Sequence, residues 1–392
     1  MIKNKSIDIQ KKENISMCSI LLFLEILLCF LANHSALFIA DYYILLVIFI
    51  GCMLIRSNMK IQINPLMLSL GIVVVSSLLF FNIMGRGTFL SYIIWLIVMI
   101  FSLEHKFSNN ELALLMWGFI LGSLIMSILL IIQQHHYKYE GSFRFTIQIL
   151  NNEEVDPNYL ASFIYIGVVF SLYQFVNKVG KMKIISLGIG IIEMFAIFQT
   201  GSRAAYLALV FLFIGLFFNK SSSQKSTSKL LMLIAIVFLL IVAAFMLSED
   251  VLNRFDFSTL MDASNLNRLQ HWKAAAVAFF KNPLLGYGAS HTMSILSTYA
   301  NHLSDAHNTF FTILLHFGLI GSIPIFSLFF KIFSGFRNKR SNEWLFYFIG
   351  FLFINFIVAN HLGISFWLPI LIFYQISSRK EFENVECSGS GI

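Results

Sequence analysis

Residues 111–132 read ELALLMWGFILGSLIMSILLII, an apolar run whose one charged side chain is Glu111 at its start. A helix of about 20 such residues crosses the ~30 Å hydrocarbon core of a membrane. Similar runs recur along the chain, and strict alternation of polar and apolar residues is absent. Because the backbone must satisfy its own hydrogen bonds in lipid, these runs favour helices. The sequence therefore predicts an all-α, polytopic transmembrane helix bundle.

The composition supports this prediction. Of 392 residues, 58% are hydrophobic and 12% are charged, whereas soluble domains carry about 25% charge. This balance excludes a soluble cytosolic enzyme and a disordered protein. The net charge of +7 is not interpreted as a nucleic-acid signal, and no nucleic-acid partner is expected. The four cysteines include no CxxC pair and no pair within one loop, so neither a metal motif nor a disulfide framework is predicted.

We expect one integral membrane domain over residues 1–392, with about twelve spans and ends uncertain by several residues. The run from Met17 to Leu31 lacks a small-residue cleavage site and is interpreted as a retained first span. The expected spans are 17–33, 36–55, 65–84, 88–103, 111–132, 158–176, 184–200, 203–218, 230–247, 307–333, 344–360 and 363–377.

The distribution of basic residues predicts the orientation. If the N-terminus is inside, 19 of the 27 Lys and Arg residues fall in cytoplasmic segments and eight fall outside. This bias follows the positive-inside rule, so we expect a protein of the cytoplasmic (inner) membrane with both termini in the cytoplasm. Two long extracytoplasmic loops result, a large one at 248–306 and a second at 133–157.

The large outer loop is expected to contain an amphipathic helix. Asp262 or Ser264 can cap its start, and Asn282-Pro283 ends it after Lys281. It is predicted to lie on the membrane surface or to pack across the mouth of the bundle. Its apolar face consists of Leu266, Leu269, Trp272, Ala276 and Phe279.

Four segments carry a resemblance to a known family. They are Asp156-Pro-Asn158, Thr200-Gly-Ser-Arg203-Ala-Ala-Tyr, Arg268-x3-Trp272 through Asn282-Pro-Leu-Leu-Gly-Tyr-Gly288, and His307-Asn308-Thr-Phe followed by Gly318-Leu-Ile-Gly321. In this order, and predicted on one face of the membrane, they resemble the O-antigen ligase/polymerase (Wzy and WaaL-like) family of membrane glycosyltransferases. The resemblance covers roughly residues 140–330.

The resemblance implies an inverting, metal-independent glycosyltransferase without a cofactor, acting on the outer face of the membrane. Its donors would be undecaprenyl-pyrophosphate-linked oligosaccharides. The family's arginines match Arg203 and Arg268, and its histidine matches His307. A flippase and a chain-length regulator are partners that the family implies.

The chemistry of these side chains agrees with those roles. Five of the eight outer basic residues are Arg, whose planar, permanently charged guanidinium suits a pyrophosphate leaving group. An imidazole such as His307 can accept the proton of an attacking sugar hydroxyl. Arg144, Arg254 and Asn158 are further candidates for substrate contacts.

Each site residue also has a structural interpretation. Arg203 could anchor a helix at the interface, Arg268 could bind headgroups, and His307-Asn308 could cap a helix. A metal at His302, Asp305 and His307 is not favoured, because a fourth ligand is lacking. Glu193 lies within a predicted span, where a buried acid is a functional hypothesis by default.

Three functions remain open at this point. A polymerase would join lipid-linked repeat units into O-antigen, capsule or exopolysaccharide, and this hypothesis is preferred. A ligase would transfer a finished glycan from its lipid carrier to an acceptor. A flippase or transporter would share the twelve-span layout, but the absence of a detectable repeat speaks against it.

Overall fold

The structure is a computed structural model. It describes residues 15–32, 48–52, 97–103, 105–139, 142–149, 153–218, 263–288, 292–299, 306–338, 342–358 and 364–379. In chain order the labelled elements are α1 (Met17–Ala32), α5 (Asn109–Gln133), β1 (His135–Tyr139), β2 (Ser142–Thr146), β3 (Gln148–Ile149), β4 (Glu153–Glu154), α6 (Pro157–Asn177), α7 (Gly180–Gln199), α8 (Arg203–Phe218), α11 (Ala263–Lys281), α12 (Thr292–Ser297), α13 (Thr309–Asn338), α14 (Asn342–Asn355) and α15 (Ile364–Ser378).

The described part of the chain is mostly helical, as predicted for a membrane protein. Four of its helices, α5, α6, α7 and α13, are long and apolar enough to cross a membrane, and α8 is a shorter apolar helix. The expected spans at 65–84 and 230–247 lie outside the described residues. Those at 36–55 and 88–103 are described only at 48–52 and 97–103, which are helical.

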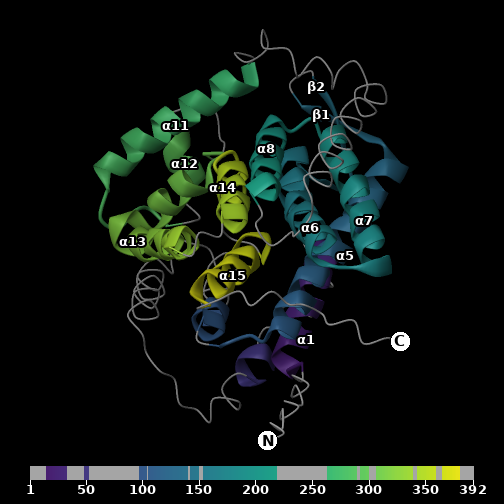
Figure 1. Ribbon diagram of the computed structural model, residues 1–392. Helices are drawn as coiled ribbons and strands as arrows, with labels where there is room; N and C mark the ends of the chain where they lie inside the picture. Colours follow the sequence, from purple (N-terminus) through teal and green to yellow (C-terminus); the bar gives the residue numbers. More distant parts are fainter. Residues whose placement is uncertain are drawn as a thin grey trace, which may run out of the picture.

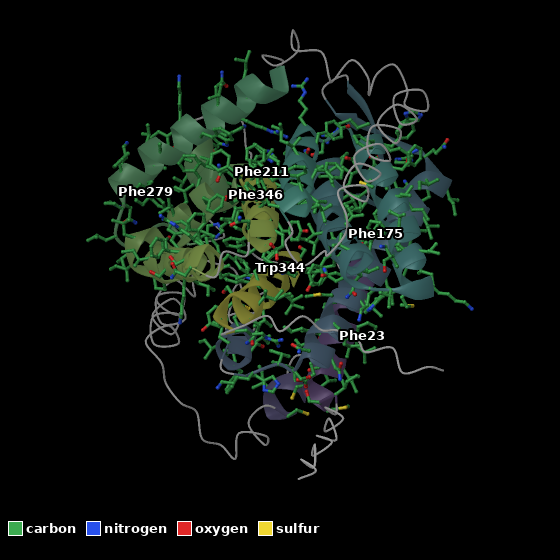
Figure 2. The ribbon with its side chains drawn as sticks, in the orientation of Figure 1. Phe23, Phe175, Phe211, Phe279, Trp344 and Phe346 are labelled. Atoms are coloured by element: carbon green, nitrogen blue, oxygen red, sulfur yellow. The ribbon has the colours of Figure 1, made fainter. Side chains whose placement is uncertain are left out.

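The helices form three adjoining groups. Figure 1 shows α11, α12 and α13 on one side and α5, α6 and α7 on the other, with α8, α14 and α15 between them. Labels in Figure 2 mark Phe211 on α8 and Phe346 on α14, the pair of helices that joins the two sides.

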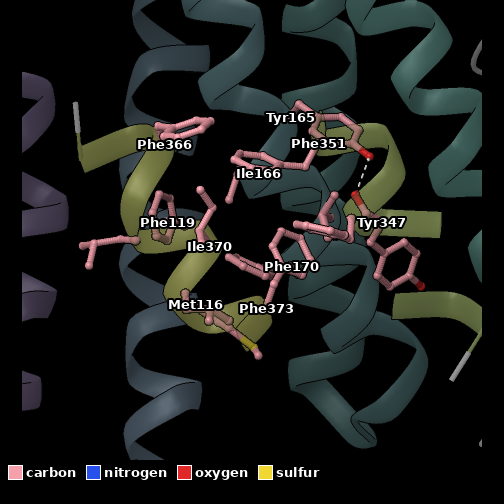
Figure 3. Close-up of a cluster of buried hydrophobic side chains, with 14 of the residues drawn as sticks. Met116, Phe119, Tyr165, Ile166, Phe170, Tyr347, Phe351, Phe366, Ile370 and Phe373 are labelled. Carbon is pink, nitrogen blue, oxygen red and sulfur yellow. Dashed lines mark hydrogen bonds between the residues drawn. The ribbon is translucent and has the colours of Figure 1, made fainter. Parts of the chain in front are cut away.

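Small residues bring the central helices close together. A Cβ on Gly215 of α8 would lie 2.7 Å from the ring of Tyr347 on α14, and one on Gly350 would lie 2.1 Å from the hydroxyl of Tyr165 on α6. This is the close approach that small residues allow between membrane helices. The Tyr165 hydroxyl donates to the Tyr347 carbonyl at 3.4 Å, within the cluster of buried hydrophobic side chains in Figure 3.

Local sequence explains where several helices begin. The Ser108 side chain accepts from the backbone N–H of Glu111, whose carboxylate accepts from the Ser108 N–H at 2.7 Å, so a capping box starts α5. The same carboxylate accepts from the N–H of Ser16 at 3.0 Å and so ties the start of α1 to the start of α5. Asp156 caps α6 and Pro157 occupies its first turn.

Two features depart from the all-helical prediction. The segment expected as a second outer loop contains two antiparallel strand pairs, β1 with β2 and β3 with β4. The expected span 307–333 is not one continuous helix, because α13 begins at Thr309 and breaks at Gly318, whose φ is 57° and ψ −162°. Strands this short lack the periodic signal that a sequence pattern requires.

Candidate functional site

Arg144 joins two of the sequence motifs at one point. It lies on β2 with its side chain buried, and its Nε donates to the carbonyl of Thr200 at 2.8 Å. Its Nη2 donates to Oδ1 of Asn158 at 2.8 Å, an oxygen that also accepts from the hydroxyl of Ser202 at 3.1 Å. The Asp156-Pro-Asn158 and Thr200-Gly-Ser-Arg203 segments are therefore held together by one buried guanidinium.

The turn from α7 to α8 presents Arg203. Thr200 is the C-cap of α7, and Gly201 follows with a φ of 63°, a conformation that an L side chain rarely adopts. Ser202 comes next, and the half-buried Arg203 is the first residue of α8. Arg203 therefore stands at a helix N-terminus, whose partial positive charge favours anions.

A second group of predicted residues lies where α11 meets the start of α13. His271, on α11, is buried, and its ring lies 6.2 Å from the ring of His307 in an edge-on arrangement. Arg268 precedes His271 by three residues, so both side chains project from neighbouring positions of one helix. Sequence analysis did not single out His271, although its spacing from Arg268 was a usable signal.

Asn308, rather than His307, caps the start of α13. Oδ1 of Asn308 accepts from the N–H groups of Phe310 at 2.9 Å and Phe311 at 3.0 Å, so Asn308 caps α13. His307 precedes the cap with a φ of 46°, in the left-handed region. Such a conformation costs on the order of 1 kcal/mol for a residue other than glycine. Asn308 therefore supplies the cap, and the His307 ring lies beside the ring of His271.

The Asn282-Pro-Leu-Leu-Gly-Tyr-Gly288 turn docks against the break in α13. The N–H of Tyr287 donates to the Leu315 carbonyl at 2.6 Å, and the N–H of Leu319 donates to the Pro283 carbonyl at 2.7 Å. A Cβ on Gly286 would lie 2.5 Å from the Leu315 carbonyl oxygen, so only glycine fits there without a shift of the backbone. This docking joins the end of α11 to α13.

The two groups lie at the same end of the bundle. The rings of Phe211 and Phe353 are 5.9 Å apart and those of Phe218 and Phe346 are 5.8 Å apart, so α8 and α14 run antiparallel. The start of α8, at Arg203, is therefore level with the residues that follow α14.

Those residues contact the second group. Phe356 packs against Trp272 of α11 with ring centroids 5.1 Å apart, and the Val358 carbonyl accepts from the hydroxyl of Thr309, at the start of α13. The helix register thus places Arg203 at the end of the bundle that also holds His271 and His307.

A comparison with family models supplies the decisive observation: residues 185–326 match the family described as O-antigen ligase. The chain carries an O-antigen ligase domain. The matched region contains Arg203, Arg268 and His307, while Arg144 and Asn158 precede it. A comparison with curated proteins returned no match.

The resemblance proposed from the sequence is therefore confirmed at the level of the family. Such a domain indicates a glycosyltransferase-type enzyme with lipid-linked glycan substrates in a membrane. Arg254, His302 and Asp305 lie outside the described residues. Within the described ranges, no three His, Cys, Asp or Glu side chains are grouped closely enough to hold a metal ion.

Proposed function

We propose that this protein is a polymerase that joins undecaprenyl-pyrophosphate-linked oligosaccharide repeat units. It would act on the outer face of the cytoplasmic membrane, with twelve spans and both termini inside. The observation that carries the proposal is the placement of Arg203, Arg268 and His307 at one end of the bundle within the O-antigen ligase domain.

The proposed reaction is a single displacement at the anomeric carbon. A hydroxyl of the acceptor sugar forms the new carbon–oxygen bond, and its proton passes to the imidazole of His307. The bond between the anomeric carbon and the pyrophosphate oxygen breaks on the opposite face, so the configuration inverts. The leaving undecaprenyl pyrophosphate takes the electron pair, and Arg203 and Arg268 stabilise its charge.

The second candidate function is a ligase, which would use the same displacement chemistry. The description of the matched family favours this candidate. The two differ in the acceptor: a polymerase uses another lipid-linked unit, whereas a ligase uses a different carrier. We expect a flippase to supply the substrate in either case, and a chain-length regulator to accompany the polymerase.

Surface polysaccharide from a deletion strain separates these functions. A polymerase deletion leaves single repeat units on their usual acceptor, whereas a ligase deletion leaves long chains on undecaprenyl pyrophosphate. Lipid-linked units retained on the cytoplasmic side would instead indicate a flippase and would refute the proposed site.

Complementation of the same strain, at matched expression, tests the residues. His307→Ala should lower polymer synthesis by roughly 10²-fold or more, as expected for loss of a general base. Arg203→Ala and Arg268→Ala should each lower it by on the order of 10²-fold. Arg337→Ala, at the far end of α13, and His136→Ala, on exposed β1, are matched controls that should complement fully. Full-length polymer from His307→Ala would eliminate it as the base.

A further inference from the structure

The helix α11 has two unlike faces. Toward the bundle it presents small side chains, Ala274, Ala275 and Ala278, which are buried against the elements around α13. On the other side, Val277 is 47% exposed and Phe280 is 76% exposed. A phenylalanine so exposed costs free energy in water, because its apolar area stays hydrated. The outward face of the C-terminal half of α11 is therefore more stable in an apolar environment than in water.

This face continues onto a membrane helix. Leu284 and Leu285, in the turn after α11, are exposed, and so are Leu319, Ile320 and Ile323 of α13. Backbone hydrogen bonds join the two segments: Leu319 N–H to the Pro283 carbonyl at 2.7 Å, and Ile320 N–H to the Leu284 carbonyl at 3.1 Å. We call these exposed residues, with Val277 and Phe280, the α11–α13 apolar surface.

The length of α13 gives the depth of this surface. Beyond the break at Gly318, the helix continues from Leu319 to Asn338. These roughly 20 residues span about 30 Å, the thickness of the hydrocarbon core. The segment reaches the opposite boundary near Arg337, a basic residue in its last turn. A membrane span over this segment would place Leu319 and Ile320 at the hydrocarbon boundary on the site end, with the turn bonded to them at the same depth.

Basic and aromatic side chains mark the adjoining headgroup level. Lys281, the last residue of α11, places its Nζ 4.7 Å from the ring centre of Tyr299. The contact with Tyr299 raises the pKa of Lys281. Lys273 is exposed one turn before Val277, on the same side of the helix. Lysine and tyrosine are typical of the interface between hydrocarbon and water.

We propose that the α11–α13 apolar surface is embedded in the acyl chains of the leaflet at the site end. The part of α11 that precedes Ala274, with Arg268 and Lys273, then rests at headgroup level. Because α11 carries His271 against His307, this anchoring also sets the depth of both imidazoles. That consequence rests on the proposed function, since it would hold the base level with the pyrophosphate of a lipid-linked substrate.

Accessibility of a nitroxide label measures the embedding directly. The full chain, with its four native cysteines replaced, would carry Phe280→Cys or Leu284→Cys, with Lys273→Cys as the matched control on the same face. Each labelled protein would be placed in phosphatidylethanolamine/phosphatidylglycerol nanodiscs and exposed to oxygen or to a water-soluble nickel chelate. We expect labels at 280 and 284 to relax faster with oxygen, and the label at 273 to relax faster with nickel.

Two results would overturn the proposal. Greater nickel access at 280 than at 273 would place this face in water. Low access to both reagents at 280, with dipolar broadening between labels, would place it against a second copy of the chain. Both readouts are independent of glycosyl transfer, so a failure of the proposed function leaves this measurement interpretable.

Discussion

Replacing Glu193 by Gln should leave the protein stable and active, whereas replacing it by Ala should destabilise the bundle. Glu193 is fully buried on α7. The hydroxyl of Ser171, on α6, donates to its Oε2 at 2.8 Å, and the hydroxyl of Ser123, on α5, lies against its Oε1. One side chain thus links three helices.

The protonation state of this carboxyl depends on where the Ser123 hydroxyl donates its single hydrogen. The Ser123 hydroxyl has one hydrogen, yet it also lies 2.7 Å from the carbonyl oxygen of Phe119, one turn earlier in α5. Helical serines commonly donate to that carbonyl. If Ser123 does so, Glu193 must supply the hydrogen between the two side chains, which a carboxylic acid or a Gln amide can do but a carboxylate cannot.

The expected magnitude follows from the two contacts. Hydrogen bonds between membrane helices contribute about 0.6 kcal/mol on average and up to about 1.7 kcal/mol, so Glu193→Ala should cost about 1–3 kcal/mol plus the effect of the void. Glu193→Gln keeps one donor and one acceptor in a similar shape and should cost less than about 1 kcal/mol.

The assay combines Tm in detergent with polymer synthesis in cells. Glu154→Gln is the matched control, because it makes the same chemical change at a surface contact with His135 and should alter neither readout measurably. A Glu193→Gln protein with normal Tm but no polymer would refute the reasoning. Such a result would mean that the ionised carboxylate is used, and it would favour the transporter hypothesis.

Three further predictions concern the site. Arg144→Ala removes two buried, charge-assisted hydrogen bonds, one of them to Asn158, and should lower stability by about 3 kcal/mol; an unchanged Tm with reduced activity would instead indicate direct substrate contact. Gly318→Ala would place a Cβ 2.3 Å from the Leu284 carbonyl oxygen at a φ of 57°, so Tm should fall and proteolysis of the docked turn should accelerate, and a wild-type digestion pattern would contradict this. Asn308→Ala should cost about 1 kcal/mol by removing the cap of α13, while Asn308→Asp should keep it, so equal Tm values for these two variants would contradict the capping role.

The helices of this protein follow closely from its hydropathy. Expected spans at 111–132, 158–176, 184–200 and 203–218 agree with α5, α6, α7 and α8 to within a few residues. The outer-loop helix expected to end at Lys281 does so in α11. These elements were predictable because apolar runs, capping residues and the Asn282-Pro283 stop act within a few residues along the chain.

The start of α13 and the pairing of the site residues do not follow from local sequence signals. His307 was expected inside the span. Instead, the side chain of Asn308 accepts hydrogen bonds from the first free N–H groups of the helix, and His307 lies before the helix in a left-handed conformation. His271 gains its place beside His307 only because the turn at Gly286 docks on α13. That docking involves backbone groups, which residue type alone does not specify.

Sequence by itself determined that the chain is a helical membrane protein with the motifs of the O-antigen ligase family. Hydropathy and charge are properties of single residues, so they can be assigned from the sequence without knowing which residues are neighbours in space. Only the tertiary structure decided which side chains meet: Arg144 with Asn158 and Glu193 with two serines. Those contacts join separate strands and helices, and they form where small residues and turns let the elements approach within hydrogen-bond distance.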